Sequence, residues 1–371
     1  MARLGDICIQ ITDGSHNPPM GVEQSNYLML SSKNIDDDYI TLNDPRYLSQ
    51  EDFEAENRRT NIKPNDLLIT IVGTIGRVAI VPNSLTEFCV QRSVAVLKPK
   101  PEIVYNRFLM HYLQSMRPYL EQESRGVAQK GIYLKQLSNL SIILPPLDEQ
   151  RKIAAVLDKV SDLIAKRRQQ LDKLDEMVKS RFIEMFGVYP ANPMGWEIGT
   201  IRDIVTEVRY GSSRPAVDGG KYPYLRMNNI TYGGELDLSD TKRIDIPDNE
   251  LDKCTVRRGD VLFNRTNSKE LVGKTCVYDR DEMMVLAGFV IRIRVKDCIL
   301  PEFLSAFLNT DFSKQMLLGM CKTAIGQANI NAQELQNIGL YLPPVELQRR
   351  FIQFKKETDK SKSFDDLEVA A

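Results

Sequence analysis

The sequence has little of what metal, disulfide or histidine chemistry requires. Its six cysteines are far apart, with no Cys-x-x-Cys pair, and its two histidines are His16 and His111. This spacing argues against a zinc site and against a disulfide framework. It fits a reducing compartment, so we expect a cytoplasmic protein. Two histidines offer little for a histidine-based metal site or a catalytic triad, so we expect neither a metal nor a cofactor.

The sequence also lacks the marks of a membrane or secreted protein. No apolar run is long enough to cross a bilayer, and residues 1–14 hold no basic region followed by a long apolar stretch. The formal net charge is −1, whereas a protein that grips nucleic acid by bulk charge is normally basic. If this chain binds DNA, we expect it to use local patches, base contacts or partners that supply positive charge.

What the chain does have is a copy of itself. Residues 127–146 align without a gap on residues 325–344, and the match extends to Gln150–Arg151 and Gln348–Arg349. The aligned pairs include Gln129 with Gln327, Ile132 with Ile330, Leu137 with Leu335, Asn139 with Asn337, Pro145–Pro146 with Pro343–Pro344, and Gly14–Ser15 with Gly211–Ser212. A repeat of about 200 residues is too long for a solenoid unit, so it indicates duplicated domains. A rough two-fold relation between two such domains is the arrangement by which protein dimers meet DNA.

Each half reads as a mixed α/β unit. In the first half, residues 66–72 and 77–81 flank a glycine-containing turn as a β-hairpin, residues 93–97 form a strand, and residues 106–116 have helical spacing. The second half repeats this order with strands at 260–263, 274–278 and 289–293 and a helix at 302–309. We therefore expect an α/β (mixed α+β) fold with two similar domains in tandem.

A long helix is predicted between the two domains. Residues 148–186 contain neither proline nor glycine, and their apolar residues follow alternating three- and four-residue steps up to Gly187. Such a helix would be roughly 60 Å long and needs a partner for its apolar stripe. The expected domains are 1–145, a central helix at 146–187, 188–343, and a shorter helix at 344–371. We expect the two helices to pair antiparallel as a spacer, and the alternative is that each packs on its own globule.

At this point the sequence resembles the specificity (S) subunit of a Type I restriction–modification system. The resemblance rests on LPPLDEQRKIAAVLDKVSDLI at 144–164 and LPPVELQRRF at 342–351. It also rests on NDLLITIVGTIGRVAIV at 65–81, on GDVLFNRTNSKELVGKTCVY at 259–278, and on the G-x-x-Q loop at 126–129 with its partner around Gln327. It covers essentially the whole chain, and the doubled helix start is its most specific part.

The resemblance implies a division of labour. Each globule would be a target recognition domain that reads one half of a split sequence in double-stranded DNA. The helices would set the gap between the half-sites and dock two DNA methyltransferase (M) subunits, with restriction–translocase (R) subunits joining the complex. Adenine methylation and ATP-driven cleavage would lie in those partners, so this chain itself would not be an enzyme. The second helical segment is much shorter than the first, which departs from the family pattern.

Three short motifs suggest an enzyme and are set aside. Residues 17–20 resemble the Asn-Pro-Pro-aromatic motif of amino-methyltransferases, but Met20 replaces the aromatic residue and no glycine-rich cofactor strand precedes it. Residues 273–275 resemble the tail of a P-loop, but Ser268 stands where the first glycine belongs. Residues 240–242 could end a metal nuclease motif, but no convincing acidic partner lies upstream. A stand-alone methyltransferase or nuclease is therefore disfavoured.

The candidate DNA-reading residues lie in polar loops at equivalent places in both halves. Arg and Lys pair with guanine and Asn and Gln with adenine, whereas backbone amides of Gly–Ser turns could take phosphates. In the first half they are Ser15, His16, Lys33, Asn34, Thr74, Arg77, Gln129 and Lys130. In the second half they are Ser212, Arg214, Arg226, Asn228, Arg265, Thr266, Asn267, Lys274, Gln327 and Asn329. The alternative for any one of them is a solvated loop residue, and the alternative for the chain is a coiled-coil adaptor that has lost DNA reading.

Overall fold

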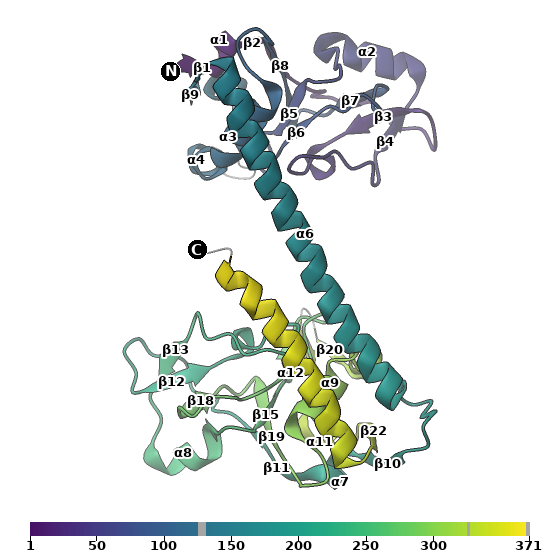
Figure 1. Ribbon diagram of the computed structural model, residues 1–371, viewed down its shortest axis with the longest axis vertical. Helices are drawn as coiled ribbons and strands as arrows, with labels where there is room; N and C mark the ends of the chain where they lie inside the picture. Colours follow the sequence, from purple (N-terminus) through teal and green to yellow (C-terminus); the bar gives the residue numbers. More distant parts are fainter. Residues whose placement is uncertain (125–130, 325–326, 369–371) are drawn as a thin grey trace. The chain divides into compact units, whose positions relative to one another are not determined.

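The computed structural model describes residues 1–124, 131–324 and 327–368, and it divides into two units, Met1–Arg167 and Arg168–Ala371 (Figure 1). Each unit combines small β-sheets with short helices, as the sequence predicts. Among the described residues, none of the helices is both long and apolar enough to cross a bilayer. The described residues also hold no group of three or more His, Cys, Asp or Glu side chains suited to a metal ion.

In unit 1 the strands form sheets in the orders β2-β8-β5-β6, β4-β3-β7 and β1-β9. Strands β5 and β6 pair antiparallel with Leu68 opposite Ala79, which confirms the predicted hairpin. The strands are β1 Ala2–Arg3, β2 Cys8–Asp13, β3 Tyr27–Leu30, β4 Arg46–Leu48, β5 Leu67–Thr70, β6 Val78–Ile80, β7 Phe88–Val90, β8 Val94–Pro99 and β9 Ser141–Ile142. The helices are α1 Leu4–Ile7, the 3₁₀ turn η1 Ser32–Asn34, α2 Gln50–Thr60, α3 Asn106–Ser115, α4 Arg117–Glu123 and α5 Leu134–Ser138.

Unit 2 repeats this topology, with sheets in the orders β11-β19-β15-β17, β13-β12-β18-β14, β16-β21-β20 and β10-β22. The strands are β10 Glu197–Thr200, β11 Val205–Tyr210, β12 Tyr222–Leu225, β13 Lys242–Ile244, β14 Thr255–Val256, β15 Val261–Asn264, β16 Thr266–Asn267, β17 Thr275–Val277, β18 Met284–Leu286, β19 Val290–Val295, β20 Lys322–Ala324, β21 Gln327–Asn329 and β22 Gly339–Leu342. The helices are α7 Ile201–Ile204, the 3₁₀ turn η2 Met227–Asn229, α8 Asp248–Cys254, α9 Pro301–Leu308, α10 Asp311–Met320, α11 Ala332–Gln336 and α12 Val345–Glu368.

The two units share packing constraints as well as topology. A Cβ atom on Gly14 would come within 1.8 Å of the Val90 carbonyl oxygen, and one on Gly211 within 2.2 Å of the Leu286 oxygen. No side chain fits there, because real Cβ contacts do not approach a backbone oxygen so closely. The aligned glycines of the repeat are therefore required by the same crossing of two backbone segments in each unit.

The predicted long helix is α6, Leu147–Phe186, whose 40 residues span about 60 Å at the usual rise per residue. Its C-terminal part belongs to unit 2, where Phe182 and Phe186 are buried against Phe303 and Phe351. These aromatic rings fix the end of α6 in the core of the second domain.

Helix α12 packs antiparallel on this end of α6 (Figure 1). The contacts run in opposite directions along the two helices: Phe351 meets Phe182, the Phe354 ring meets Arg181, and Lys362 Nζ lies 2.6 Å from Asp175 Oδ1. The sequence therefore predicts both the pairing and its direction.

Candidate nucleic-acid interface

Two buried asparagines shape matching loops in the two units. Asn34 accepts a hydrogen bond from the Ser31 amide through Oδ1 and donates from Nδ2 to the carbonyls of Thr41 and Asn43. Asn229 does the same in unit 2, accepting from the Arg226 amide and donating to the carbonyls of Asp237 and Asp240, and the six bonds of the two asparagines measure 2.8–3.2 Å. Both side chains are buried. Asn34 therefore organises its loop, and the exposed neighbours Lys33 and Asn228 are the side chains that the loops present.

The Gly–Ser turns are likewise built into the backbone. The Ser15 amide donates to the Val90 carbonyl at 2.8 Å, and the Ser212 amide donates to the Leu286 carbonyl at 2.7 Å. The side chains of Ser15 and Ser212 are buried. Because these two amides already have partners, they are not free to cradle a phosphate in this conformation.

In unit 2 the structure brings several predicted residues together. Strand β16 pairs with β21, with Thr266 opposite Asn329, and the Ile330 amide donates to the Arg265 carbonyl. Arg265 donates to Asn329 Oδ1 at 3.1 Å and lies over the Tyr210 ring at 4.8 Å. Asn267 is half-buried beside them, and Thr266 is buried. Arg265, Asn267 and Asn329 thus form one polar surface next to an aromatic ring.

Unit 1 has the corresponding backbone contacts around a hollow. Val72 bridges to Gly131, and the Ile132 amide donates to the Ile71 carbonyl as the Ile330 amide does in unit 2. Beside this bridge is a hollow of about 450 Å³. Its lining consists of Gly73, Thr74, Ile75, Arg77, Arg117, Glu121 and Ser124. Thr74 is exposed and Arg77 half-buried, so both predicted side chains reach this hollow.

Lys274 is placed differently from the other predicted cations. It is 7% exposed, and its Nζ donates to the Met227 carbonyl at 2.9 Å. Burial lowers the pKa of this ammonium below its usual value. A buried lysine that is bonded to a backbone carbonyl holds the η2 loop in place, and it is the loop rather than the ammonium that faces outward.

Three other predicted cations pair with acidic neighbours. Lys33 pairs with Asp44 at 2.5 Å, Arg214 with Glu250 at 2.7 Å, and Arg226 with Asp240 at 2.9 Å. In each pair at least one side chain is well exposed. Surface pairs of this kind contribute at most about 1 kcal/mol, so a phosphate or a base can exchange for the carboxylate at little cost.

His16 belongs to a similar surface network. Its Nε2 lies 2.8 Å from Asp13 Oδ2, and Arg59 Nη2 donates to the other oxygen of the same carboxylate at 2.6 Å. Arg59 also donates to the Gly14 carbonyl at 2.8 Å. The network positions His16 at the edge of the Gly–Ser turn.

The family of the chain follows from a match that spans most of both units. The model of the Type I restriction modification DNA specificity domain matches residues 24–175 and again residues 193–362. The chain belongs to this family. The repeat seen in the sequence is therefore two copies of one specificity domain.

Individual relatives agree with this assignment. The chain is 24% identical over 275 residues to the Type I restriction enzyme EcoKI specificity subunit of Escherichia coli strain K12, covering 69% of this chain and 59% of the relative. It is also 24% identical over 334 residues to the MjaVIII specificity subunit of Methanocaldococcus jannaschii, covering 82% and 74%. The crystal structure of the S subunit from M. genitalium matches with a TM-score of 0.51 at 14% identity, covering 100% and 91%, which shows a shared fold.

Within the specificity-domain frame, some predicted residues have no described side chain. Gln129 and Lys130 lie outside the described residues, and of Gln327 the structure describes the backbone in β21. The sequence prediction missed Tyr210, Phe289 and Arg117. Tyr210 and Phe289 are 43% and 51% exposed beside Arg265. The signal available in the sequence for Tyr210 is its place directly before the Gly211–Ser212 turn.

Several residues of the motifs that suggested an enzyme make structural contacts. Lys274, the lysine of the P-loop-like tail, is bonded to Met227. Asp240, the acid of the nuclease-like fragment, pairs with Arg226. The carbonyls of Pro18 and Pro19 accept from Arg46.

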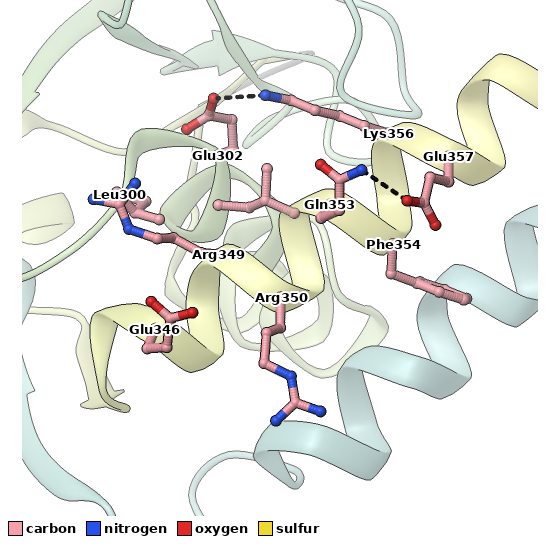
Figure 2. Close-up of a pocket in the computed structure, with 10 residues that line it drawn as sticks. Leu300, Glu302, Glu346, Arg349, Arg350, Gln353, Phe354, Lys356 and Glu357 are labelled. Atoms are coloured by element: carbon pink, nitrogen blue, oxygen red, sulfur yellow. Dashed lines mark hydrogen bonds and ion pairs between the residues drawn. The ribbon is translucent and has the colours of Figure 1, made fainter.

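A second hollow, of about 610 Å³, lies on unit 2 at the start of α12 (Figure 2). Acidic and basic side chains alternate around it, with Lys356 paired to Glu302 at 3.9 Å and Gln353 donating to Glu357 at 2.7 Å. Its charged lining consists of Glu302, Glu346, Arg349, Arg350, Lys356 and Glu357. A surface of mixed sign does not favour a polyanion, which separates this hollow from the candidate DNA loops.

Proposed function

We propose that this chain is the DNA sequence-recognition subunit of a Type I restriction–modification complex, with each unit reading one half of a bipartite target. The observation that carries the proposal is that one loop frame is built twice with different side chains. Arg265 occupies the position that Ile71 has in unit 1. The Arg265 carbonyl accepts from the Ile330 amide, just as the Ile71 carbonyl accepts from the aligned Ile132 amide. Two domains that share a backbone but present different side chains suit recognition of two different half-sites.

The spacer and docking roles belong to the same proposal. We assign residues 1–145 and 188–343 to target recognition, residues 146–187 to the central spacer helix, and residues 344–371 to a shorter second arm. The exposed apolar side chains Val156 and Leu163 on α6, at 61% and 65%, and the mixed-charge hollow at α12 support docking of protein partners. We propose two methyltransferase subunits and, through the complex, restriction–translocase subunits as those partners.

The chemistry of the complex is assigned to the partners rather than to this chain. The chain spans 59% of the length of its EcoKI relative and 74% of the MjaVIII subunit, so activity and partners are inferred from family membership together with the loop geometry. We propose that the chain contributes recognition without catalysis. We place it in the cytoplasm, where host and invading DNA meet, and the free cysteines suit that compartment.

Footprinting on duplex DNA tests the proposal. The chain is co-purified with its methyltransferase subunit and bound to a random duplex library, and the selected duplexes are then footprinted. We expect two protected segments of defined sequence separated by a gap of fixed length and undefined sequence. A stable protein complex that selects no sequence would contradict DNA reading and would favour the adaptor function.

A further inference from the structure

One cationic side chain in each unit joins two candidate reading loops to each other. In unit 1 it is Arg117, the first residue of α4. Its Nε donates to the Gly76 carbonyl in the β5–β6 hairpin at 3.3 Å, and its guanidinium also pairs with Asp37 in the loop after η1. The hairpin carries Thr74 and Arg77, and the η1 loop carries Lys33. Arg117 therefore bonds to both loops at once.

In unit 2 the corresponding cation is Lys314 on α10. Its Nζ donates to the Gly273 carbonyl at 3.0 Å and lies over the Tyr232 ring, 5.3 Å from the ring centroid. Gly273 ends the loop that carries Arg265 and Asn267, and Tyr232 lies in the loop after η2 that follows Asn228. Lys314 thus makes the same two connections with different chemistry.

The two partners of each cation correspond between the units by features that do not involve the cation. Ile35 bridges to Ile40 and Ile230 to Leu236, which places Asp37 and Tyr232 at the same point of their loops. Gly76 and Gly273 both have positive φ, at +83° and +82°. An ion pair in one unit is therefore replaced by a cation–π contact in the other, while the carbonyl contact is kept.

We propose that Arg117 and Lys314 are positioning residues for DNA reading, each holding its two reading loops in fixed register. We call Asp37, Gly76 and Arg117 the brace of unit 1, and Tyr232, Gly273 and Lys314 the brace of unit 2. A loop that shifts by about 1 Å loses the geometry of a bidentate base contact. The brace thus keeps the loops in register, although its cations need not touch a base. This inference rests on the proposed function.

The closest alternative is that these cations bind phosphates directly. Arg117 is 31% exposed and lines the 450 Å³ hollow, so a phosphate could reach it. The two roles predict different results. Loss of a phosphate contact weakens binding about equally for all sequences and lowers the salt slope by about one, whereas loss of positioning relaxes one half-site.

The test uses the full chain, co-expressed with its methyltransferase subunit, and maps the methylated motif. Arg117→Met should reduce discrimination about tenfold in one half of the motif, within the range of a single mismatched base pair, and should leave the other half unchanged. Lys314→Met should relax the opposite half. Arg117→Lys, which keeps a donating cation, should stay within about threefold of wild type.

Tyr232 provides a test that does not depend on a buried group. Its side chain is 60% exposed, so its replacement leaves the core intact. Tyr232→Phe keeps the ring face and should preserve the motif, whereas Tyr232→Leu should relax the same half as Lys314→Met. Arg58→Met on α2 and Lys253→Met on α8 remove exposed positive charges on matching helices and serve as controls that keep the wild-type motif.

The outcomes separate the brace from the proposed function. If the wild-type chain directs no motif, the proposed function fails before any variant is compared. If the wild type directs a split motif and both Met variants keep it, the positioning role is wrong. A uniform loss of affinity at both halves, with a lower salt slope, would also overturn it in favour of phosphate binding.

Discussion

Gln150 and Gln348 make the same three hydrogen bonds at the starts of the two long helices. Gln150 donates from Nε2 to the carbonyls of Pro145 and Ile103 and accepts from the Tyr105 amide. Gln348 donates to the carbonyls of Pro343 and Cys298 and accepts from the Leu300 amide. Both side chains are 0% exposed. A buried glutamine thus fastens each helix to the loop that precedes α3 or α9.

Replacing either glutamine should destabilise its own unit. Gln150→Leu leaves two carbonyls and an amide, all in part-buried hydrogen bonds, without their side-chain partner, and a fully buried group left so costs about 1–3 kcal/mol. After partial relaxation we expect a loss of about 2–4 kcal/mol in the free energy of unfolding. Urea unfolding measures it, with Gln169→Leu on the exposed surface of α6 as the control, expected within about 0.5 kcal/mol of wild type. Equal stability of the Gln150 and Gln169 variants would contradict the fastening role.

Arg265 should determine bases in one half-site only. It is held between Asn329 and the Tyr210 ring, so its guanidinium is preoriented for a bidentate contact with guanine. Arg265→Ala should lose about 1–3 kcal/mol of discrimination at one position. Arg265→Lys should recover little of it, because an ammonium cannot make the planar bidentate contact. Competition binding with single-base variants of the selected duplex measures both, and a loss spread over both half-sites would contradict the assignment.

Asp158 should stabilise unit 1 in a pH-dependent way. Burial opposes its charge, but hydrogen bonds and charge from Arg107 and His111 outweigh it and lower the pKa of this carboxyl. Because the folded pKa lies below the unfolded value, the stabilisation is present above about pH 4 and is lost as pH falls through the folded pKa. Asp158→Asn should cost about 1 kcal/mol at pH 7, and the difference from wild type should shrink below pH 4. A difference that is constant across pH would rule out the ionic contribution.

Lys314 should produce a pH dependence of the same sign, but at high pH. Burial, and then the nearby charge of Lys274, lower the pKa of its ammonium to about 8. Between about 8 and the ordinary lysine value near 10.4 the unfolded chain binds more protons than the folded one, so stability rises with pH in that window. The difference in unfolding free energy between wild type and Lys314→Met should therefore increase from pH 8 to pH 10. Comparing the two isolates Lys314 from other groups that titrate there, and a flat difference would mean that Lys314 titrates as if it were exposed.

The sequence predicts the parts of the fold that repeat or follow a simple period. The aligned pairs around Pro145–Pro146 and Pro343–Pro344 reveal the duplication, and the apolar steps of residues 148–186 predict α6 almost to its ends. Turn chemistry predicts the β5–β6 hairpin. These features depend on patterns along the chain, so a single sequence is enough to predict them.

Burial and long-range pairing could not be predicted in the same way. In the sequence Asn34 and Lys274 look like exposed loop residues, but both are buried and donate hydrogen bonds to backbone carbonyls of other segments. The ion pair Arg107–Asp158 has its counterpart in Glu302–Lys356, with the charges exchanged. Because each aligned position carries the opposite charge in the other half, an alignment of the repeats does not reveal the shared ion pair.

The most direct test of the central claim is a genome-wide map of adenine methylation in cells that express this chain with its methyltransferase subunit. The account predicts new methylation at one split motif of two defined segments and a fixed gap, absent when the chain is omitted. Arg265→Ala should relax one segment of that motif and leave the other intact. New methylation at a continuous motif, or none despite a stable complex, would contradict recognition by two domains.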